Sequence, residues 1–150
     1  MTQAIGDDGY ARLLAVRTRL RQFEHWSAQQ AAEHGLTASQ HQLLLAVRGH
    51  RDPAGPTIND IADYLFIRHN TAVELINRTQ ELGVLERVRD ADDQRAVRLR
   101  LTRQGRRLLR ALARSHVEEL ARLAPLVDEL VEKLVAGFGD REQNTASSAH

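Results

Sequence analysis

The sequence predicts a mainly α-helical fold that carries one small β-hairpin. Apolar residues recur at helical spacing near the N-terminus and again over the last third of the chain. Between these segments, the run Ala96–Leu101 alternates apolar and charged residues, as a half-buried strand does. With 150 residues, the chain is long enough for about one domain with a core of its own.

The first predicted helix covers residues 10–34 and carries an apolar stripe on one side. No proline interrupts this segment, and Gly35 is a typical C-terminal stop. A second helix follows Thr37 or Ser39, either of which can cap it. It ends before the loop of residues 48–56, which holds two prolines and two glycines. The stripe of the first helix consists of Tyr10, Leu13, Val16, Leu20 and Phe23.

Two shorter helices joined by a tight turn come next. Residues 57–60, TIND, have the capping-box pattern with Asp in the place usually given to Glu or Gln. They begin a helix that runs from Ile58 to about Tyr64, and residues 65–67 form the turn after it. A further helix runs from about residue 69 to residue 82, where Gly83 ends it. The pattern is that of a helix-turn-helix.

A hairpin and the C-terminal helices complete the predicted fold. Residues 84–88 and 96–101 are the two strands, and residues 90–94 are the turn between them. Thr102 caps a long helix, and Pro125 interrupts it, so we expect a separate last helix to begin there. From Gly137 onward the residues are small and polar, which favours a frayed tail.

Several functional classes are excluded by what the sequence lacks. It has no apolar run near 18 residues and no signal-peptide pattern in its first residues, so we expect a cytoplasmic protein without a membrane span. Without cysteine there is no disulfide and no thiol chemistry. No nucleophile motif, phosphate loop or paired carboxylates are present, and no two histidines have the i, i+4 spacing of a helical metal site. We therefore predict no catalytic residue, metal or cofactor.

Basic residues gather in the middle of the chain. Residues 68–110 hold eleven arginines against six acidic residues, whereas residues 1–67 hold six against seven. Residues 111–150 hold four basic and seven acidic residues, and among the four is Lys133, the only lysine of the chain. A basic centre between acidic ends is typical of a nucleic-acid footprint, and a solvated charged face is the alternative.

A helix-turn-helix followed by a hairpin has a physical use on DNA. The second helix fits the major groove, which is about 12 Å wide. The hairpin then reaches the flanking backbone or minor groove, where an arginine at its tip meets a strong negative potential. Arg95 would be that arginine, with Asp93 holding the loop by pairing with a nearby arginine. The alternative for Arg95 is a solvated loop residue.

Three stretches of this sequence resemble the MarR family of winged helix-turn-helix regulators. They are LTASQHQLLLAV, INDIADYLFIRHNTAVELINRTQELGVLERV and DADDQRAVRLRLTRQG, and they span about residues 36–109. The spacing D-x-R, an alternating strand and then LT-x-x-G is the most specific part. The resemblance implies a homodimer that binds double-stranded DNA as a transcriptional regulator. Such regulators are often repressors released by a small, frequently aromatic ligand. The alternative is a DNA-binding or architectural protein without an effector.

The resemblance also implies which residues meet DNA. At the slot where a serine often caps the recognition helix this chain has Arg68, which cannot accept N–H bonds, so Asn70 or water would satisfy that helix end. Glu74 is acidic where a basic or small residue is common; it would accept from cytosine N4, orient Arg78 or weaken non-specific binding. Asn70 and Thr71 are either contacts or caps alone. The predicted DNA-binding residues are Arg68, His69, Asn70, Thr71, Glu74, Arg78, Asp93 and Arg95.

The long outer helices are predicted to form the dimer, because their leucine stripes are wider than the middle of the chain can cover. A monomeric bundle is the alternative. The predicted domains are an N-terminal dimerisation helix (1–36), the winged helix-turn-helix lobe (37–102), C-terminal dimerisation helices (103–138) and a flexible tail (139–150). Family members usually bind the effector where long helices meet the lobe. The candidates here are Phe23, His25, Trp26 and His41, although Phe23 and Trp26 equally suit a dimer core.

Overall fold

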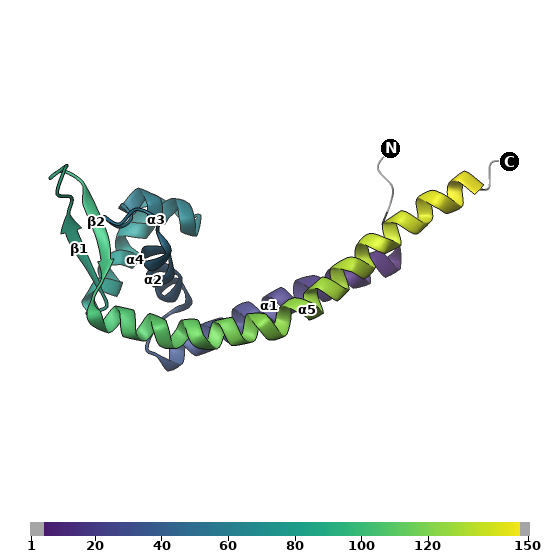
Figure 1. Ribbon diagram of the computed structural model, residues 1–150, viewed down its shortest axis with the longest axis horizontal. Coiled ribbons are helices and arrows are strands. Elements are labelled where there is room, and N and C mark those ends of the chain that lie inside the picture. The colour runs from purple at the N-terminus through teal and green to yellow at the C-terminus, as the bar shows by residue number, and fades with distance from the viewer. Residues whose placement is uncertain (1–4, 148–150) are drawn as a thin grey trace. The chain divides into compact units, whose positions relative to one another are not determined.

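The computed structural model describes residues 5–147, with side chains as far as residue 138. Its elements follow the predicted order of helices and hairpin (Figure 1). The chain divides into two compact units. The first unit reaches to Trp26 and resumes at His116, and the second comprises Ser27–Ser115. This confirms a mainly α-helical fold with one small antiparallel hairpin.

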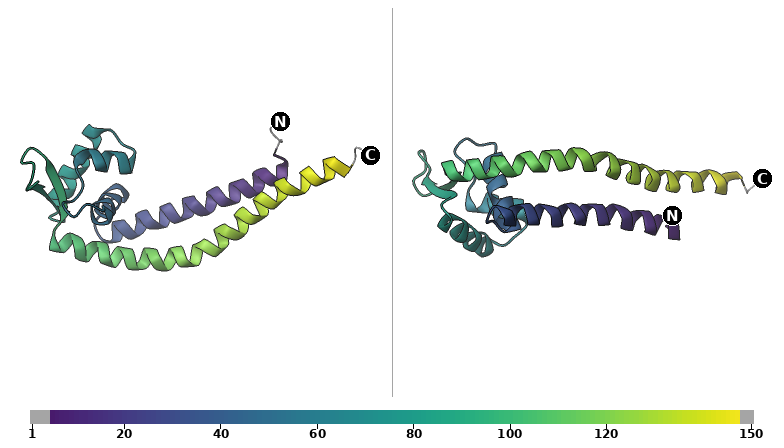
Figure 2. Two further views of the ribbon diagram at one scale, coloured as in Figure 1. Left: turned by 45° about the horizontal axis from the view of Figure 1, so that its top comes forward. Right: turned by 90° about the horizontal axis from the view of Figure 1, so that it is seen from below.

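The first unit consists of two long helices. These are α1 (Asp7–Glu33), up to Trp26, and the part of α5 (Arg103–Ser147) that follows residue 115. They lie side by side in Figures 1 and 2. Arg12 Nη1 donates a 2.5 Å hydrogen bond to the carbonyl oxygen of Lys133, and the Lys133 amine donates to Glu129 at 2.8 Å. Few side chains of this unit are buried, Leu123 being one of them.

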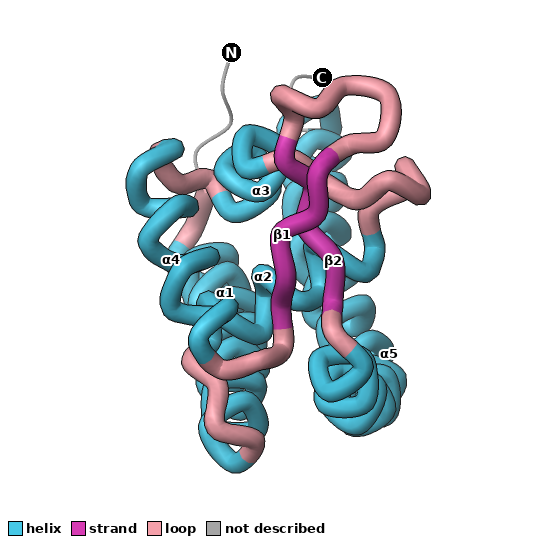
Figure 3. The backbone as a smooth tube through the Cα atoms, turned by 90° about the vertical axis from the view of Figure 1, so that its left-hand side faces the viewer, coloured by secondary structure: helices cyan, strands magenta, loops and turns pink. Residues whose placement is uncertain are grey.

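The second unit is the winged helix-turn-helix. It holds α2 (Ala38–Gly49), α3 (Ile58–Leu65), α4 (His69–Glu81), β1 (Leu85–Arg89), β2 (Val97–Leu101) and the start of α5 (Figure 3). One core cluster joins these elements, so α4 and the hairpin rest on a common support. The largest fully buried aliphatic side chains of that cluster are Leu43, Leu44, Ile61, Ile76, Leu85, Leu99 and Leu112.

Side-chain caps begin the two helices that precede α4. Thr37 Oγ1 accepts from the Gln40 N–H at 3.1 Å, and the Gln40 side chain accepts from the Thr37 N–H at 2.9 Å. Thr57 and Asp60 form the same reciprocal pair at 3.2 and 2.9 Å, as the TIND pattern predicts. These bonds occupy N–H groups that a helix N-terminus leaves unsatisfied. Because the Thr57 N–H donates to it, the Asp60 carboxyl has a lowered pKa.

Two glycines let neighbouring backbones approach each other at the base of the hairpin. A Cβ at Gly105 would collide with the Val84 carbonyl, so the first turn of α5 can lie against the start of β1 only without a side chain there. A Cβ at Gly55 would likewise collide with the Leu99 carbonyl, beside the 2.9 Å bond from the Leu99 N–H to the Pro56 carbonyl. Thr102 caps α5 as predicted, because its Oγ1 accepts from the Gly105 N–H at 3.1 Å.

The C-terminal region differs from the prediction. We expected Pro125 to separate two helices, but α5 is one helix with this proline inside it. Proline removes one backbone donor and strains one turn, and the helical pattern on both sides outweighs that loss. The helix also continues to Ser147, through most of the segment 139–150 where the sequence predicts a flexible tail. Residues 148–150 lie outside the described part of the chain.

Strand boundaries shift by one residue from those predicted. Strand β1 begins at Leu85 rather than Val84, and β2 begins at Val97 rather than Ala96. The register pairs Leu85 with Leu101 and Arg89 with Val97. No helix among the described residues is both long enough and apolar enough to cross a membrane.

Candidate nucleic-acid interface

Helix α4 presents a polar, exposed face opposite a buried one. Its buried side consists of Ala72, Ile76 and Thr79, which anchor it to the core, and Thr79 Oγ1 donates to the Leu75 carbonyl at 2.7 Å. This arrangement fixes which side chains face outward. All six predicted contact residues of this region are exposed: Arg68, His69, Asn70, Thr71, Glu74 and Arg78.

The N-terminus of α4 has no side-chain cap. Arg68 occupies the N-cap position and makes no capping hydrogen bond, as expected for a side chain without an acceptor. Next to it, the His69 ring lies 2.8 Å from Asn59 Oδ1, which ties the start of α4 to α3. The first N–H groups of α4 therefore receive no hydrogen bond from the N-cap side chain, and the positive end of the helix dipole lies beside an exposed arginine. An anionic group such as a phosphate fits this end of a helix.

A hollow separates α4 from the start of α2. It has a volume of about 380 Å³, and Thr71, Glu74 and Arg78 line one side of it. Thr37 and Gln40 lie on the α2 side. Glu74 and Arg78 are one turn apart, so their charges are neighbours on the same face. No hydrogen bond joins the two side chains among the described residues, and the orientation of Arg78 by Glu74, one of three alternatives for this carboxylate, stays a prediction.

Asp90 organises the loop of the hairpin. Its Oδ1 accepts from the N–H groups of Asp92 at 2.8 Å and Asp93 at 3.3 Å, and its Oδ2 accepts from Arg98 Nε at 2.9 Å. The bond from the Asp92 N–H, followed by the bond from Arg98, lowers the pKa of the Asp90 carboxyl. The carboxylate thus accepts three hydrogen bonds, and together they hold the loop closed.

Arg98 connects this loop to the rest of the second unit. Besides Asp90, its guanidinium donates to the Gly55 carbonyl at 3.2 Å and lies 4.0 Å from Asp52. Here the sequence prediction was wrong in one respect. We expected Asp93 to pair with an arginine, but Asp93 accepts the backbone N–H of Arg95 at 3.0 Å. The carboxylate that pairs with an arginine is Asp90, and DADD alone does not say which of its three aspartates faces β2.

The Arg95 side chain stands at the exposed tip of the loop. Arg89, at the end of β1, donates to the Gln94 carbonyl at 3.2 Å and so holds the chain just before Arg95. In the middle of β1, Arg87 donates to Gln80 and, at 2.7 Å, to Asn77. Both acceptors belong to α4. The hairpin and α4 are therefore tied together by side chains as well as by the core.

The predicted ligand residues are divided between the two units of the chain. Phe23 and Trp26 meet in the first unit with ring centroids 5.9 Å apart, and His116 lies 4.8 Å from Trp26 and 6.0 Å from Phe23. His25 is exposed on the same helix and does not line the adjoining cavity. His41 is buried in the core of the second unit. Sequence reasoning missed His116, because its contact partners lie about ninety residues earlier.

A cavity of about 220 Å³ adjoins this aromatic group. Phe23, Trp26 and Leu123 provide its apolar wall. Its polar residues are Arg19, Gln22, Glu119 and Arg122, and the last two pair with each other at 3.1 Å. Arg19 is therefore the cation most available to an anion here. Among the described residues, no group of three or more acidic or histidine side chains could hold a metal ion.

Comparisons with known proteins agree with this geometry. The MarR family model matches residues 34–96. The transcriptional regulator PecS of Dickeya dadantii (strain 3937) is 26% identical over 118 residues, which are 78% of this chain and 71% of PecS. The S. aureus MepR–DNA complex superposes with a TM-score of 0.63 at 23% identity and covers 97% of this chain and 99% of MepR. AbsC, a MarR family regulator from Streptomyces coelicolor, gives 0.70 at 18% identity and covers 97% and 99%.

Proposed function

We propose that the chain is a homodimeric, cytoplasmic regulator of the MarR family, whose family model matches residues 34–96. It would bind double-stranded DNA and release it on binding a small aromatic or anionic ligand. Members of this family regulate transcription and are not enzymes, in agreement with the sequence prediction. The proposal rests on two features that occur together in the second unit. One is the exposed N-terminus of α4, which has no side-chain cap. The other is the wing, whose loop carries Arg95 and is held by the hydrogen bond between Asp90 and Arg98.

Helix α4 would lie in the major groove and the wing would reach the neighbouring minor groove. Arg68 would bind phosphate at the helix N-terminus, and His69, Asn70 and Thr71 would stand nearest the base edges. Arg95 would enter the minor groove, with Asp93 fixing its backbone. We further propose that the regulator is a repressor, because a protein bound over promoter DNA can block transcription.

The first unit suits a dimer interface and an effector site. Its aromatic cavity offers a flat apolar wall and Arg19, a combination that fits an aromatic acid. Exposed apolar side chains run along both of its helices, more than a monomer ordinarily leaves in water. These side chains are Tyr10, Leu13, Leu14, Leu20, Val117, Leu120, Val131, Val135 and Phe138.

The proposal is tested by titrating the protein into labelled DNA from upstream of its own gene. Fluorescence anisotropy at two salt concentrations, with unrelated DNA as the control, measures selectivity and the phosphate contribution together. Tight, selective binding supports a regulator with a nearby operator. Equal, weak binding that disappears with salt supports the architectural alternative, and no binding to either DNA contradicts the proposal.

An effector is tested in the same assay by adding a small aromatic acid. Loss of DNA affinity in the wild type, but not in Arg19→Gln, would support the aromatic cavity as the effector site. An affinity that never responds to such acids would favour a DNA-binding protein without an effector.

A further inference from the structure

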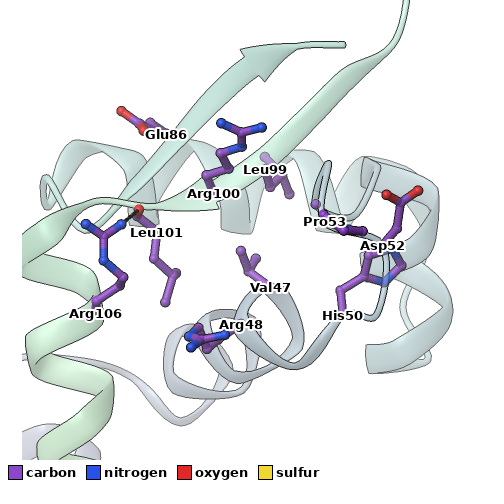
Figure 4. Close-up of a pocket in the computed structure, with 11 residues that line it drawn as sticks. Val47, Arg48, His50, Asp52, Pro53, Glu86, Leu99, Arg100, Leu101 and Arg106 are labelled. Carbon is purple, nitrogen blue, oxygen red and sulfur yellow. Dashed lines mark hydrogen bonds between the residues drawn. The ribbon is translucent and has the colours of Figure 1, made fainter. Parts of the chain in front are cut away.

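Phe66, in the turn between α3 and α4, is a large apolar residue on the surface of the winged helix-turn-helix unit. It is 95% exposed, more than any other large apolar residue in the described part of the chain. The hairpin shows the usual arrangement for comparison. There Leu99 and Leu101 are buried, whereas Glu86 and Arg100 are exposed on the opposite face (Figure 4). At Phe66 an apolar ring is exposed instead, so it contributes little to the core.

The backbone holds Phe66 in this outward position. The Phe66 N–H donates to the Asp63 carbonyl at 3.3 Å, and the Ile67 N–H donates to the Ala62 carbonyl at 3.0 Å. These two bonds end α3 as a Schellman motif, in which the first residue beyond the helix is left-handed and usually glycine. Leu65 and Ile67, on either side, pack against the core. The turn therefore directs Phe66 alone toward solvent.

Phe66 has a backbone conformation that glycine adopts most easily. Its φ is 54°, and it is the only non-glycine residue with a positive φ among the described residues. At the other left-handed positions of this part of the chain, the residues are Gly35, Gly55 and Gly83. A side chain in this conformation lowers stability, and the burial of the ring is too small to offset that loss. Strain that packing does not compensate is typical of functional sites.

Phe66 also lies beside the proposed DNA-binding surface. It precedes Arg68, the N-cap of α4, by two residues, so the two Cα atoms are at most about 7 Å apart. The His69 ring lies 2.8 Å from the Asn59 side chain and thereby ties the start of α4 to α3, the two helices that the turn connects. A phosphate bound at the N-terminus of α4 would therefore be within reach of a side chain as long as phenylalanine.

We propose that Phe66 is a DNA contact, whose ring packs against a deoxyribose next to the phosphate at the N-terminus of α4. Each phosphate of DNA joins two deoxyriboses, and their C–H groups are the apolar surface nearest to it. Contacts to phosphate and sugar position a protein on the duplex. The complex would remove the ring from water, a gain that the free protein lacks. This inference rests on the proposed function and adds an apolar contact to a predicted set that is otherwise polar.

Fluorescence anisotropy with labelled DNA from upstream of the gene compares wild type with Phe66→Ala, which keeps the left-handed strain and removes the ring. We expect Phe66→Ala to bind about tenfold more weakly, the equivalent of about 1.4 kcal/mol. Phe66→Leu, which keeps an apolar side chain, should recover part of the affinity. Leu82→Ala is the control, because it removes an exposed apolar side chain about 20 Å away, at the other end of α4, and should bind like wild type.

The salt dependence of binding separates an apolar contact from an ionic one. A ring packed on a sugar releases no counterions, so Phe66→Ala should lower the affinity by the same factor at each salt concentration. Arg68→Gln, which loses a phosphate contact, should reduce the slope of log K against log salt by about one. If Phe66→Ala reduced the slope as Arg68→Gln does, the turn would act through Arg68, and the proposed contact would be overturned.

Fluorine NMR observes the ring directly. The chain has three phenylalanines, so 4-fluorophenylalanine gives a simple spectrum, and the Phe66 signal is the one missing from Phe66→Ala. We expect its solvent isotope shift, which reports contact with water, to fall when DNA binds. A ring that stays in water in the complex, or a Phe66→Ala that binds like wild type, would overturn the inference and leave the regulator proposal intact. If the wild type bound no DNA, the regulator proposal itself would fail, and this contact with it.

Discussion

Arg95 illustrates how a single exposed side chain gains its position from neighbouring residues of its loop. Its backbone N–H is held by Asp93, and the loop that carries it is closed by Asp90. The Arg95 side chain therefore projects from an ordered turn rather than from a free loop. Because the loop is already ordered before binding, less conformational entropy is lost when Arg95 binds DNA.

Replacing Arg95 by alanine should weaken DNA binding and leave folding intact. The expected loss is roughly 1–3 kcal/mol, the range for one specific contact. Anisotropy titrations of Arg95→Ala against operator DNA measure it, with Arg51→Ala as a control for the loss of one exposed positive charge. Equal affinity of Arg95→Ala and wild type would rule out the wing assignment.

Glu74 is the residue whose contribution is most specific to this chain. Removal of a base-reading carboxylate should change sequence preference more than overall affinity. We expect Glu74→Ala to flatten discrimination at one or two positions in a set of single-base operator variants. A variant that changes only the salt dependence of binding would show that Glu74 acts through general electrostatics.

Phe66 is held in a conformation that suits glycine. It has φ of 54°, follows α3 as its C-cap, and is 95% exposed, so its ring gains little from burial. Left-handed backbone costs a non-glycine residue about 1–2 kcal/mol. Phe66→Gly should therefore raise the free energy of unfolding by roughly 0.5–1 kcal/mol, once the larger entropy of the unfolded glycine chain is subtracted.

Thermal or urea unfolding measures this increase in the free energy of unfolding. Gly83→Ala is the opposite substitution, because it places a side chain on a left-handed residue that has none. Gly83 has φ of 75° with room for a side chain, so alanine there should lower stability through backbone strain alone. If Phe66→Gly lowers stability, the exposed ring makes a contribution that its surroundings do not explain.

At the scale of elements, the wing should be sensitive to acid. The Asp90 carboxyl has a lowered pKa because it accepts bonds in the folded loop, so its stabilising effect is complete above the ordinary aspartate pKa, roughly 3.9. That effect is lost as the pH falls through the lowered pKa of the folded state. Asp92 amide shifts recorded from neutral to acidic pH should report this loss.

Asp90→Asn and Asp92→Asn separate the two neighbouring aspartates in that titration. Asp90→Asn should loosen the wing at neutral pH and abolish the acid transition, whereas Asp92→Asn should retain it. Comparison with core amides such as Ile76 distinguishes loosening of the wing from global unfolding. An acid transition that persists in Asp90→Asn would assign it to another group.

The elements most accurately predicted from sequence are those set by local chemistry. Thr57 with Asp60, and Gly83 after α4, act within a few residues of themselves, so the pattern contains the whole cause. Pro125 was misleading because a proline removes only one helical bond, and continuation of the helix depends on the packing of both sides. The Asp90–Arg98 pair was missed because its partners are eight residues apart across a turn whose geometry the sequence does not state.

For the whole molecule, the proposed dimer depends on apolar side chains that one chain leaves in water. Leu14 and Val117 are 64% and 66% exposed in the first unit. Leu14→Glu and Val117→Glu should each shift the protein toward monomer in sedimentation experiments, because burying a carboxylate in an apolar interface is unfavourable. Helical content should stay unchanged, since neither residue supports its own chain. Variants that sediment like wild type would place the interface elsewhere.

Lys133 has a chemical consequence as the only lysine of the chain. It lies on α5 in the first unit, so every cation of the winged helix-turn-helix unit is an arginine or a histidine. Guanidinium groups stay protonated and do not react with acylating reagents at neutral pH. Acetylation of lysine therefore cannot neutralise the proposed DNA-facing surface. For the same reason, an amine-reactive dye or surface linker would couple at Lys133 or at the chain's α-amino group and leave that surface chemically intact.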